Sequence, residues 1–177
     1  MVLTPLPRRA GPRPAVSAGI PHRQLDQQPD PAGLRLALVA AVLDNLPAGV
    51  HEEPSGISVP GARALVLDAP AGPPAAFLTG REFAHLHPVP DSSLHLTLPE
   101  ATAQEAVAAG WAEPHPLVAT GRIPPTTVLV YAPRTHEEID VVRHLLDQSY
   151  EFAHSTAPVH THGSPAARSL PQLTQRD

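Results

Sequence analysis

Three histidines lie within eleven positions of the sequence, in a stretch that otherwise alternates like a pair of β-strands. His85 and His87 stand two apart in "REFAHLHP", and His95 stands in "SSLHLTLP". Residues two apart on a strand share a face, so His85 and His87 point the same way. Because Leu94 and Leu96 are expected to turn toward the core, His95 must lie on the other face of its strand.

The register of these two strands decides whether the three imidazoles meet. Pairing His87 with Ser93 leaves a five-residue loop, 88–92, and puts His85 directly opposite His95. Opposed Cβ atoms in such a ladder are roughly 5 Å apart. A shift by one residue would turn the leucines outward, which the hydrophobic effect disfavours. The apolar pattern therefore predicts a cluster of His85, His87 and His95 on one face of the sheet.

Such a cluster supports more than one kind of chemistry. An H-x-H pair with a third histidine across the ladder is a workable three-imidazole metal site with an open coordination position. Clustered imidazoles also lower one another's pKa values, which keeps at least one neutral and basic near pH 7. A third interpretation is a polar, solvent-facing sheet surface without chemistry. The pattern alone leaves all three open.

Four neighbouring residues are further candidates. His115, in "GWAEPHPL", can reach the histidine face from its loop, and Trp111 offers either an aromatic wall for a planar ligand or a core residue. By strand parity Arg81 shares the histidine face, where it can hold an anion. Glu82 falls on the opposite face, where a structural ion pair competes with a chemical role.

The elements that must position these residues can be read from periodicity and turn signals. We expect helices over 30–46, 99–109 and 135–153, strands over 62–68, 75–80, 81–87, 93–98 and 126–133, a short edge strand within 51–59, and an irregular loop over 111–125. This order predicts a single α+β domain over 30–154, in which an antiparallel β-sheet is packed with helices. The Pro-rich stretch 1–29 and the tail 155–177 are predicted to be disordered.

Composition narrows the function classes. The absence of cysteine excludes disulfides, thiolate zinc sites and a cysteine nucleophile. A formal net charge of −5 with no basic block in the domain argues against nucleic acid as a partner. The longest apolar stretch, 34–46, is shorter than the ~20 residues of a membrane span, and no signal peptide is apparent at the N-terminus. We expect a cytoplasmic protein.

Four segments in order suggest a family: "REFAHLHPVPDSSLHL", "GWAEPHPL", "TTVLVYAPR" and "EEIDVVRHLLDQSYEFA". Together they resemble the luciferase-domain family, which includes the fungal bioluminescence luciferases and many bacterial proteins of unassigned role. The resemblance covers about residues 80–153, and the Ala-, Pro- and Arg-rich composition favours a bacterial member. It implies an oxygenase that adds O₂ to an electron-rich hydroxypyrone or polyphenol-like compound without a flavin. It also implies a site made of His85, His87, His95 and His115, with Arg81, Glu82 and Trp111 binding the substrate.

We therefore expect His85 or His95 to act as the base, with His87, His115 and Arg81 stabilising the anion. No cofactor is required by the resemblance, and a metal ion held by His85, His87 and His95 is the open alternative. The partners are then a small-molecule substrate and O₂, and the sequence gives no oligomeric state. Two other functions stay open: a non-catalytic module that binds a small ligand or metal, and an interaction domain whose Pro-rich ends recruit partners.

Overall fold

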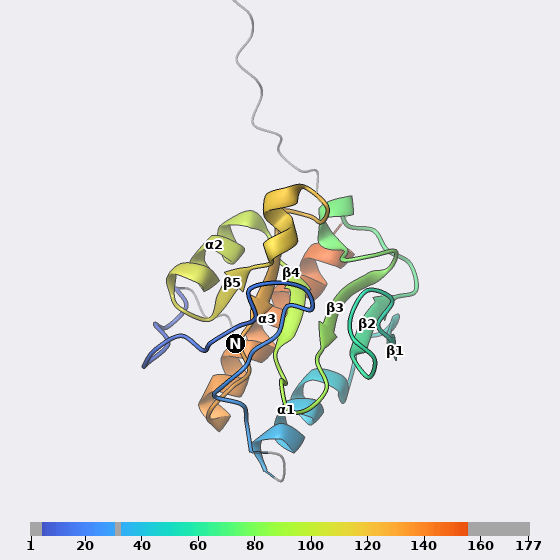
Figure 1. Ribbon diagram of the computed structural model, residues 1–177. Coiled ribbons are helices and arrows are strands. Elements are labelled where there is room, and N and C mark those ends of the chain that lie inside the picture. Colours follow the sequence, from blue (N-terminus) through green and yellow to red (C-terminus); the bar gives the residue numbers. More distant parts are fainter. Residues whose placement is uncertain (1–4, 31–32, 156–177) are drawn as a thin grey trace, which may run out of the picture.

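The computed structural model describes residues 5–30 and 33–155, and Figure 1 shows their path. Their strands form one antiparallel sheet, in the order β1-β2-β3-β4-β6-β5. The strands are β1 (Val50–Pro54), β2 (Arg63–Leu67), β3 (Glu82–Leu86), β4 (Leu94–Thr97), β5 (Ala112–Pro114) and β6 (Thr127–Val130). The expected single α+β domain with an antiparallel sheet is confirmed.

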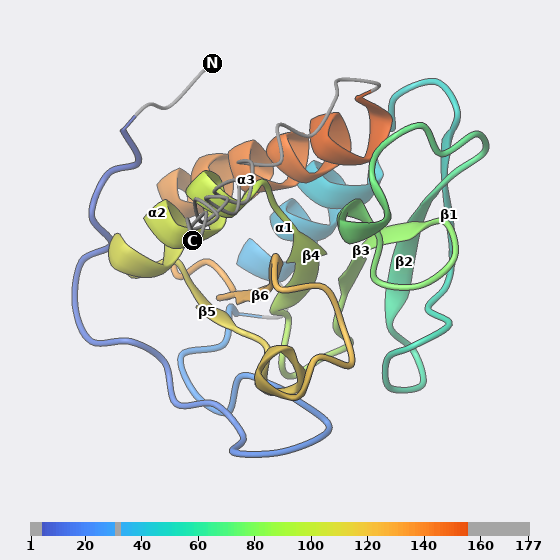
Figure 2. The ribbon, with the colours of Figure 1, turned by 90° about the horizontal axis from the view of Figure 1, so that it is seen from above.

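The α-helices gather on one side of this sheet, as the view from above shows (Figure 2). They are α1 (Leu34–Leu43), α2 (Glu100–Ala108) and α3 (His136–His154), and two short 3₁₀ helices are η1 (Pro74–Ala76) and η2 (Pro116–Thr120). Thr135 caps α3 by accepting a hydrogen bond from the Glu138 amide at 3.3 Å, as its spacing in the sequence indicates. Within the described residues, no helix is long and apolar enough to cross a membrane.

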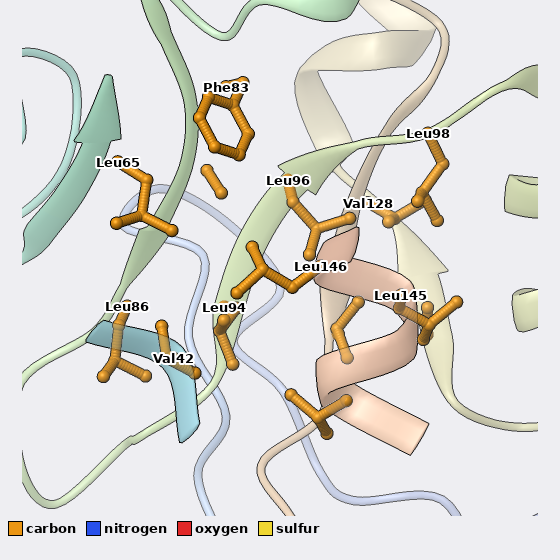
Figure 3. Close-up of a cluster of buried hydrophobic side chains, with 14 of the residues drawn as sticks. Val42, Leu65, Phe83, Leu86, Leu94, Leu96, Leu98, Val128, Leu145 and Leu146 are labelled. Atoms are coloured by element: carbon orange, nitrogen blue, oxygen red, sulfur yellow. The ribbon is translucent and has the colours of Figure 1, made fainter. Parts of the chain in front are cut away.

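The core lies between the helices and one face of the sheet. Leu94 and Leu96 of β4 are fully buried and face Leu145 and Leu146 of α3, with Val42 of α1 alongside (Figure 3). Each such side chain stabilises the fold by about 2 kcal/mol through the removal of apolar surface from water. This packing fixes which way β4 faces, and so turns His95 to the far side.

The register of β3 and β4 is the predicted one. His85 pairs with His95, flanked by the pairs Ala84–Leu96 and Leu86–Leu94. Beyond the last pair, the His87 amide donates to the Ser93 carbonyl at 2.9 Å, which closes the loop 88–92. The apolar alternation therefore decided this register, as expected.

Two element predictions are wrong. Residues 75–80 do not form a strand, because Pro73 and Pro74 open the turn of η1, and nearby threonines satisfy its carbonyls. Thr126 Oγ1 donates to the Ala75 carbonyl at 2.8 Å, and Thr97 Oγ1 donates to the Ala76 carbonyl at 2.7 Å. The stretch 111–125 is not wholly irregular either, because it contains β5 and η2.

The prediction of disorder over 1–29 is wrong for the described residues 5–29. This N-terminal segment crosses the face of the sheet opposite the helices (Figure 2). The buried Arg9 guanidinium donates to Glu138 at 2.9 Å and to the Ala132 carbonyl at 2.8 Å. The buried Gln24 side chain accepts from the Ala132 amide at 2.8 Å. The segment lacks apolar periodicity because polar groups hold it, and the predicted disorder over 156–177 lies outside the described residues.

Candidate active site

β3 and β4 bring together the three histidines that the sequence predicts. The ring centroids of His85 and His95 are 5.1 Å apart, and those of His87 and His95 are 4.7 Å apart. The three residues are at most 5% exposed, so they do not form a solvent-facing polar surface. His85 Nε2 lies 3.1 Å from His95 Nδ1. The predicted clustering is confirmed, and burial removes the surface interpretation.

A β-bulge in β3 changes the environment of His85. Leu65 and Val66 of β2 are consecutive, yet they pair with Ala84 and Glu82, so Phe83 is the extra residue. Glu82 thereby joins the histidine face, where its Oε1 lies 2.6 Å from His85 Nδ1. The expectation that Glu82 faces away from the histidines was wrong, because strict alternation cannot foresee a bulge.

The loop after β1 holds the Glu82 carboxylate in place. Ser55 Oγ donates to Oε1 at 2.8 Å, and the Gly56 amide donates to Oε2 at 3.0 Å. Glu82 accepts both of these hydrogen bonds, so its contact with His85 is that of a carboxylate with a ring N–H. The carboxylate therefore fixes the tautomer of His85 with the proton on Nδ1.

Arg81 lies at the edge of the sheet. Its guanidinium donates to the Leu67 carbonyl at 3.0 Å and lies 3.5 Å from Glu53. Arg81 is not among the residues that line the cavity described below. Trp111 is 4% exposed, and its Nε1 donates to the Pro7 carbonyl at 2.6 Å. It is thus a core residue that anchors the N-terminal segment rather than a wall of the cavity described below.

His87 is also oriented by a carboxylate. Its Nδ1 lies 2.7 Å from Asp91 Oδ2 and 3.1 Å from Ser93 Oγ. Asp91 Oδ1 accepts from Ser93 Oγ at 2.6 Å and from the Gln24 amide at 3.2 Å. Because Ser93 Oγ donates its proton to Asp91, it accepts from His87, so the ring proton of His87 resides on Nδ1.

A fourth histidine comes from the N-terminal segment, for which the sequence predicted no site residue. His22 is 2% exposed, and its Nδ1 lies 3.1 Å from His95 Nε2. Its Nε2 lies 2.9 Å from Glu113 Oε1, while Tyr131 donates its hydroxyl to Glu113 Oε2 at 2.8 Å. A lone histidine among prolines has no pattern that marks it, so no signal in this sequence pointed to His22.

His115 approaches from the other rim, as the sequence suggested. Its ring centroid lies 4.7 Å from that of His95 and 5.0 Å from that of His22. Its Nδ1 accepts a hydrogen bond from the Leu117 amide at 3.1 Å, so the ring proton of neutral His115 is on Nε2. We refer to His22, His85, His87, His95 and His115 as the histidine cluster.

The histidine cluster forms the floor of a cavity of about 260 Å³. All five histidines line it, and its walls are mainly apolar: Ile20, Pro21, Ile57, Val59, Leu78, Leu117 and Ile123. Ile20 and Ile57 are 61% and 47% exposed, which places large apolar side chains in contact with solvent at the cavity. Apolar walls with a few convergent polar groups are typical of small-molecule sites.

Burial and mutual repulsion keep four of the five imidazoles neutral. Burial is the main cause that lowers the pKa of His95 well below its usual value, and the neighbouring imidazoles lower it further. Burial likewise lowers the pKa of His115 to about 4, with a further contribution from His22. The pKa values of His22 and His85 are lowered mainly by burial, against the opposing effect of Glu113 and Glu82. These four rings are therefore neutral near pH 7.

Two triplets of histidines within the cluster have ligand atoms close enough to hold a metal ion. One is His85, His87 and His95, and the other is His22, His95 and His115, with one nitrogen of each member within 4.8 Å of the others. Buried imidazoles of this kind suit first-row transition metals. The geometry thus accommodates either acid–base chemistry or a metal.

The chain resembles known proteins over most of its length. Residues 80–149 match the family model of the luciferase domain. A luciferase of Armillaria gallica is 35% identical over 165 residues, covering 85% of this chain and 62% of that protein. A luciferase of Neonothopanus nambi is 32% identical over the same length, covering 85% of this chain and 61% of that protein. The chain thus spans about three fifths of the length of these relatives, and no solved structure matches it.

Proposed function

Because this chain belongs to the luciferase-domain family, we propose that it is a flavin-independent oxygenase that adds O₂ to an enolisable hydroxypyrone or polyphenol-like compound. One observation carries the proposal: five histidines line a cavity whose other lining residues are mainly apolar. A planar, largely apolar substrate fits such walls, and its enol oxygen would meet the imidazoles. Glu82 contributes by orienting His85, whereas Arg81 and Trp111, which do not line the cavity, have no part in it.

The first step of the proposed reaction is removal of the enol proton. A neutral imidazole accepts a proton readily, and burial keeps the rings of His85 and His95 neutral. We assign the base to one of these two residues. The substrate anion then transfers electron density to O₂, a carbon–oxygen bond forms, and the proton returns to the distal oxygen to give a hydroperoxide. The atoms balance without a reductant, because both oxygen atoms enter the product.

His115 suits the stabilisation of negative charge. Since its Nδ1 accepts from the Leu117 amide, its Nε2–H is a hydrogen-bond donor beside the cavity. A preorganised donor in a site shielded from water stabilises a developing oxyanion or peroxide more than the same donor does in bulk solvent. The paired roles, a lone pair on one ring and an N–H on another, are what proton removal followed by charge stabilisation requires.

An oxygen electrode tests the proposal directly. Purified protein is mixed with a hydroxypyrone or a flavonol, and saturable O₂ uptake above the uncatalysed rate is expected. His85→Ala should lower the rate at least ~100-fold, as loss of a general base does. His51→Ala is the matched control, because His51 lies on β1 outside the cavity. Tight binding of the same compounds without O₂ uptake would instead support a non-catalytic ligand-binding domain.

A further inference from the structure

The hydrogen-bond partners of the central histidines assign a position to each ring proton. The Nδ1 atoms of His85 and His87 face Glu82 and Asp91, at 2.6 and 2.7 Å. Glu82 accepts hydrogen bonds as a carboxylate, and Ser93 Oγ accepts from His87 because its own proton goes to Asp91, so Nδ1 of each histidine carries the proton. The Nε2 atoms of both histidines are then left with unshared electron pairs.

The position of the ring proton of His95 follows from its hydrogen bond with the imidazole of His22. Glu113 accepts from Tyr131, so His22 donates to Glu113 from Nε2 and keeps a lone pair on Nδ1. His95 Nε2 faces this lone pair at 3.1 Å and is its donor. His95 Nδ1 is therefore also left without a proton.

The nitrogens left without a proton are Nε2 of His85, Nε2 of His87 and Nδ1 of His95, and these three histidines each have a ring nitrogen within 4.8 Å of the others. We call these three unprotonated atoms the inner nitrogens. Two of them, on His85 and His95, are only 3.1 Å apart with no proton assigned between them. Lone pairs at that distance repel unless a positive charge lies between them. Nitrogens bound to a tetrahedral ion with bonds of about 2.0–2.1 Å are roughly 3.3 Å apart, close to the separation seen here.

We propose that the inner nitrogens of His85, His87 and His95 bind a divalent first-row transition-metal ion such as Zn²⁺. Each ligand would donate its outer N–H to an oriented acceptor, namely Glu82, the Ser93–Asp91 pair and the His22–Glu113 pair. That arrangement is the usual second layer of contacts around metal-bound histidines. The negative charge of these carboxylates is offset by a dication, and three protein ligands leave a coordination position open.

The alternative triplet, His22, His95 and His115, does not qualify. Neutral His115 carries its proton on Nε2, because Nδ1 accepts from the Leu117 amide. His22 already uses its lone pair to accept from His95. The two triplets share His95, so substitutions of His87 and His115 tell them apart.

The inference uses the same imidazoles as the proposed oxygenase and deepens it. A metal ion at the inner nitrogens would act as a Lewis acid that makes the enol proton more acidic. His85 and His95 would then be ligands rather than bases, and the proton would pass to water. Its test needs no turnover. Metal binding without O₂ uptake would defeat the oxygenase proposal alone, and O₂ uptake by protein that binds no metal would defeat this inference alone.

The experiment is a titration of chelator-treated full-length protein with Zn²⁺, followed by calorimetry, elemental analysis and thermal melting. A background in which His160 and His162 are alanine removes the H-x-H of the tail as a competing ligand pair. One Zn²⁺ per chain and a raised melting temperature are expected. With Co²⁺ as the probe, visible ligand-field bands of a tetrahedral site are expected, and His87→Ala should abolish them.

The Zn²⁺ affinities of three variants decide whether the proposed triplet binds the metal. His87→Ala should weaken Zn²⁺ binding at least ~100-fold, and Asp91→Asn, which keeps the shape of the side chain, should weaken it roughly 10–100-fold. His115→Ala should change the affinity less than about threefold. Zinc content near zero, equal loss in all variants, or loss in His115→Ala with retention in His87→Ala would overturn the proposal. If His87→Ala fails to fold, Asp91→Asn and the Co²⁺ spectrum of the parent protein carry the test.

Discussion

Leu94 and Leu96 face helix α3, whereas His95, between them on the same strand, faces the cavity. All three side chains are at most 5% exposed, yet they are buried by different means. The leucines are covered by other apolar side chains, and their burial stabilises the fold directly. The imidazole loses hydration on burial, and its hydrogen bond with His22 offsets part of that loss.

The two faces of β3 and β4 therefore contribute to the protein in different ways. The leucine face holds the strands in register, so its substitutions should affect stability. The histidine face holds buried polar groups, which usually contribute little net stability, and the proposed chemistry is assigned to this face. Substitutions on opposite faces of one strand can test this difference between the leucine face and the histidine face.

The largest effect is expected from Leu96→Ala. Leu96 is fully buried against α3, so removal of its side chain leaves a cavity in the core. The free energy of unfolding should fall by about 3 kcal/mol, within the 2–5 kcal/mol usual for such changes. Urea denaturation followed by circular dichroism measures it. A loss under about 1 kcal/mol would show that the leucine face does not carry the stability.

His95→Leu should give the converse result. An apolar side chain of similar size replaces the central imidazole, so we expect the free energy of unfolding to fall by less than about 2 kcal/mol, or to rise. Oxygen uptake with the substrate accepted by the parent protein should fall at least ~100-fold. Retained uptake would remove His95 from the chemistry, and unfolding as severe as that of Leu96→Ala would erase the contrast between the faces.

The apolar packing could be predicted from the sequence more completely than the polar packing. Apolar alternation with a period of two was sufficient to place His85 opposite His95, because a wrong register would expose leucines. Phe83 broke that alternation with a bulge, which brought Glu82 to the histidine face against the prediction. A bulge depends on pairing with β2, and no local pattern encodes it.

The N-terminal segment was missed for a different reason. Sequence reasoning finds packed segments through apolar periodicity, and this one is held by Arg9, His22 and Gln24 instead. Their partners lie 67 to 129 residues away in the chain, so no local spacing reveals them. The relatives give a signal that the single sequence lacks, because their similarity covers 85% of the chain and so extends beyond residues 80–149.

A third test separates this polar anchoring from apolar packing by pH. Burial alone would raise the pKa of Glu138, but hydrogen bonds from Arg134 and Arg9 lower it to about 2. In the unfolded chain the carboxyl returns to about 4.5, so the unfolded state binds more protons between these values. The stability from this anchor is present above pH 4.5 and is lost as the pH falls toward 2.

Urea denaturation across that pH range should show the loss in the parent protein. Glu138→Gln removes the titrating group, so its free energy of unfolding should fall less steeply with acidification. Arg9→Met should flatten the profile in part, because Arg134 still donates to Glu138. Identical slopes in the three proteins would mean that the buried anchor contributes no pH-dependent stability.

The smallest effect is expected from Arg81→Gln. Its guanidinium lies at a half-exposed edge near Glu53, where ion pairs contribute about 0–1 kcal/mol. Stability should change by less than about 1 kcal/mol, and oxygen uptake should stay within about twofold of the parent rate. A large loss of uptake would show that Arg81 takes part in the reaction although it does not line the cavity.

The placement of His22 bears on how the proposed activity could be moved between proteins. One wall of the cavity and one member of the histidine cluster come from the first thirty residues, far in sequence from the family's hallmark segment. A protein engineer who transplanted residues 80–149 alone would carry four of the five histidines and leave the cavity open on one side. The unit that evolution can shuffle is therefore larger than the stretch by which the family is recognised.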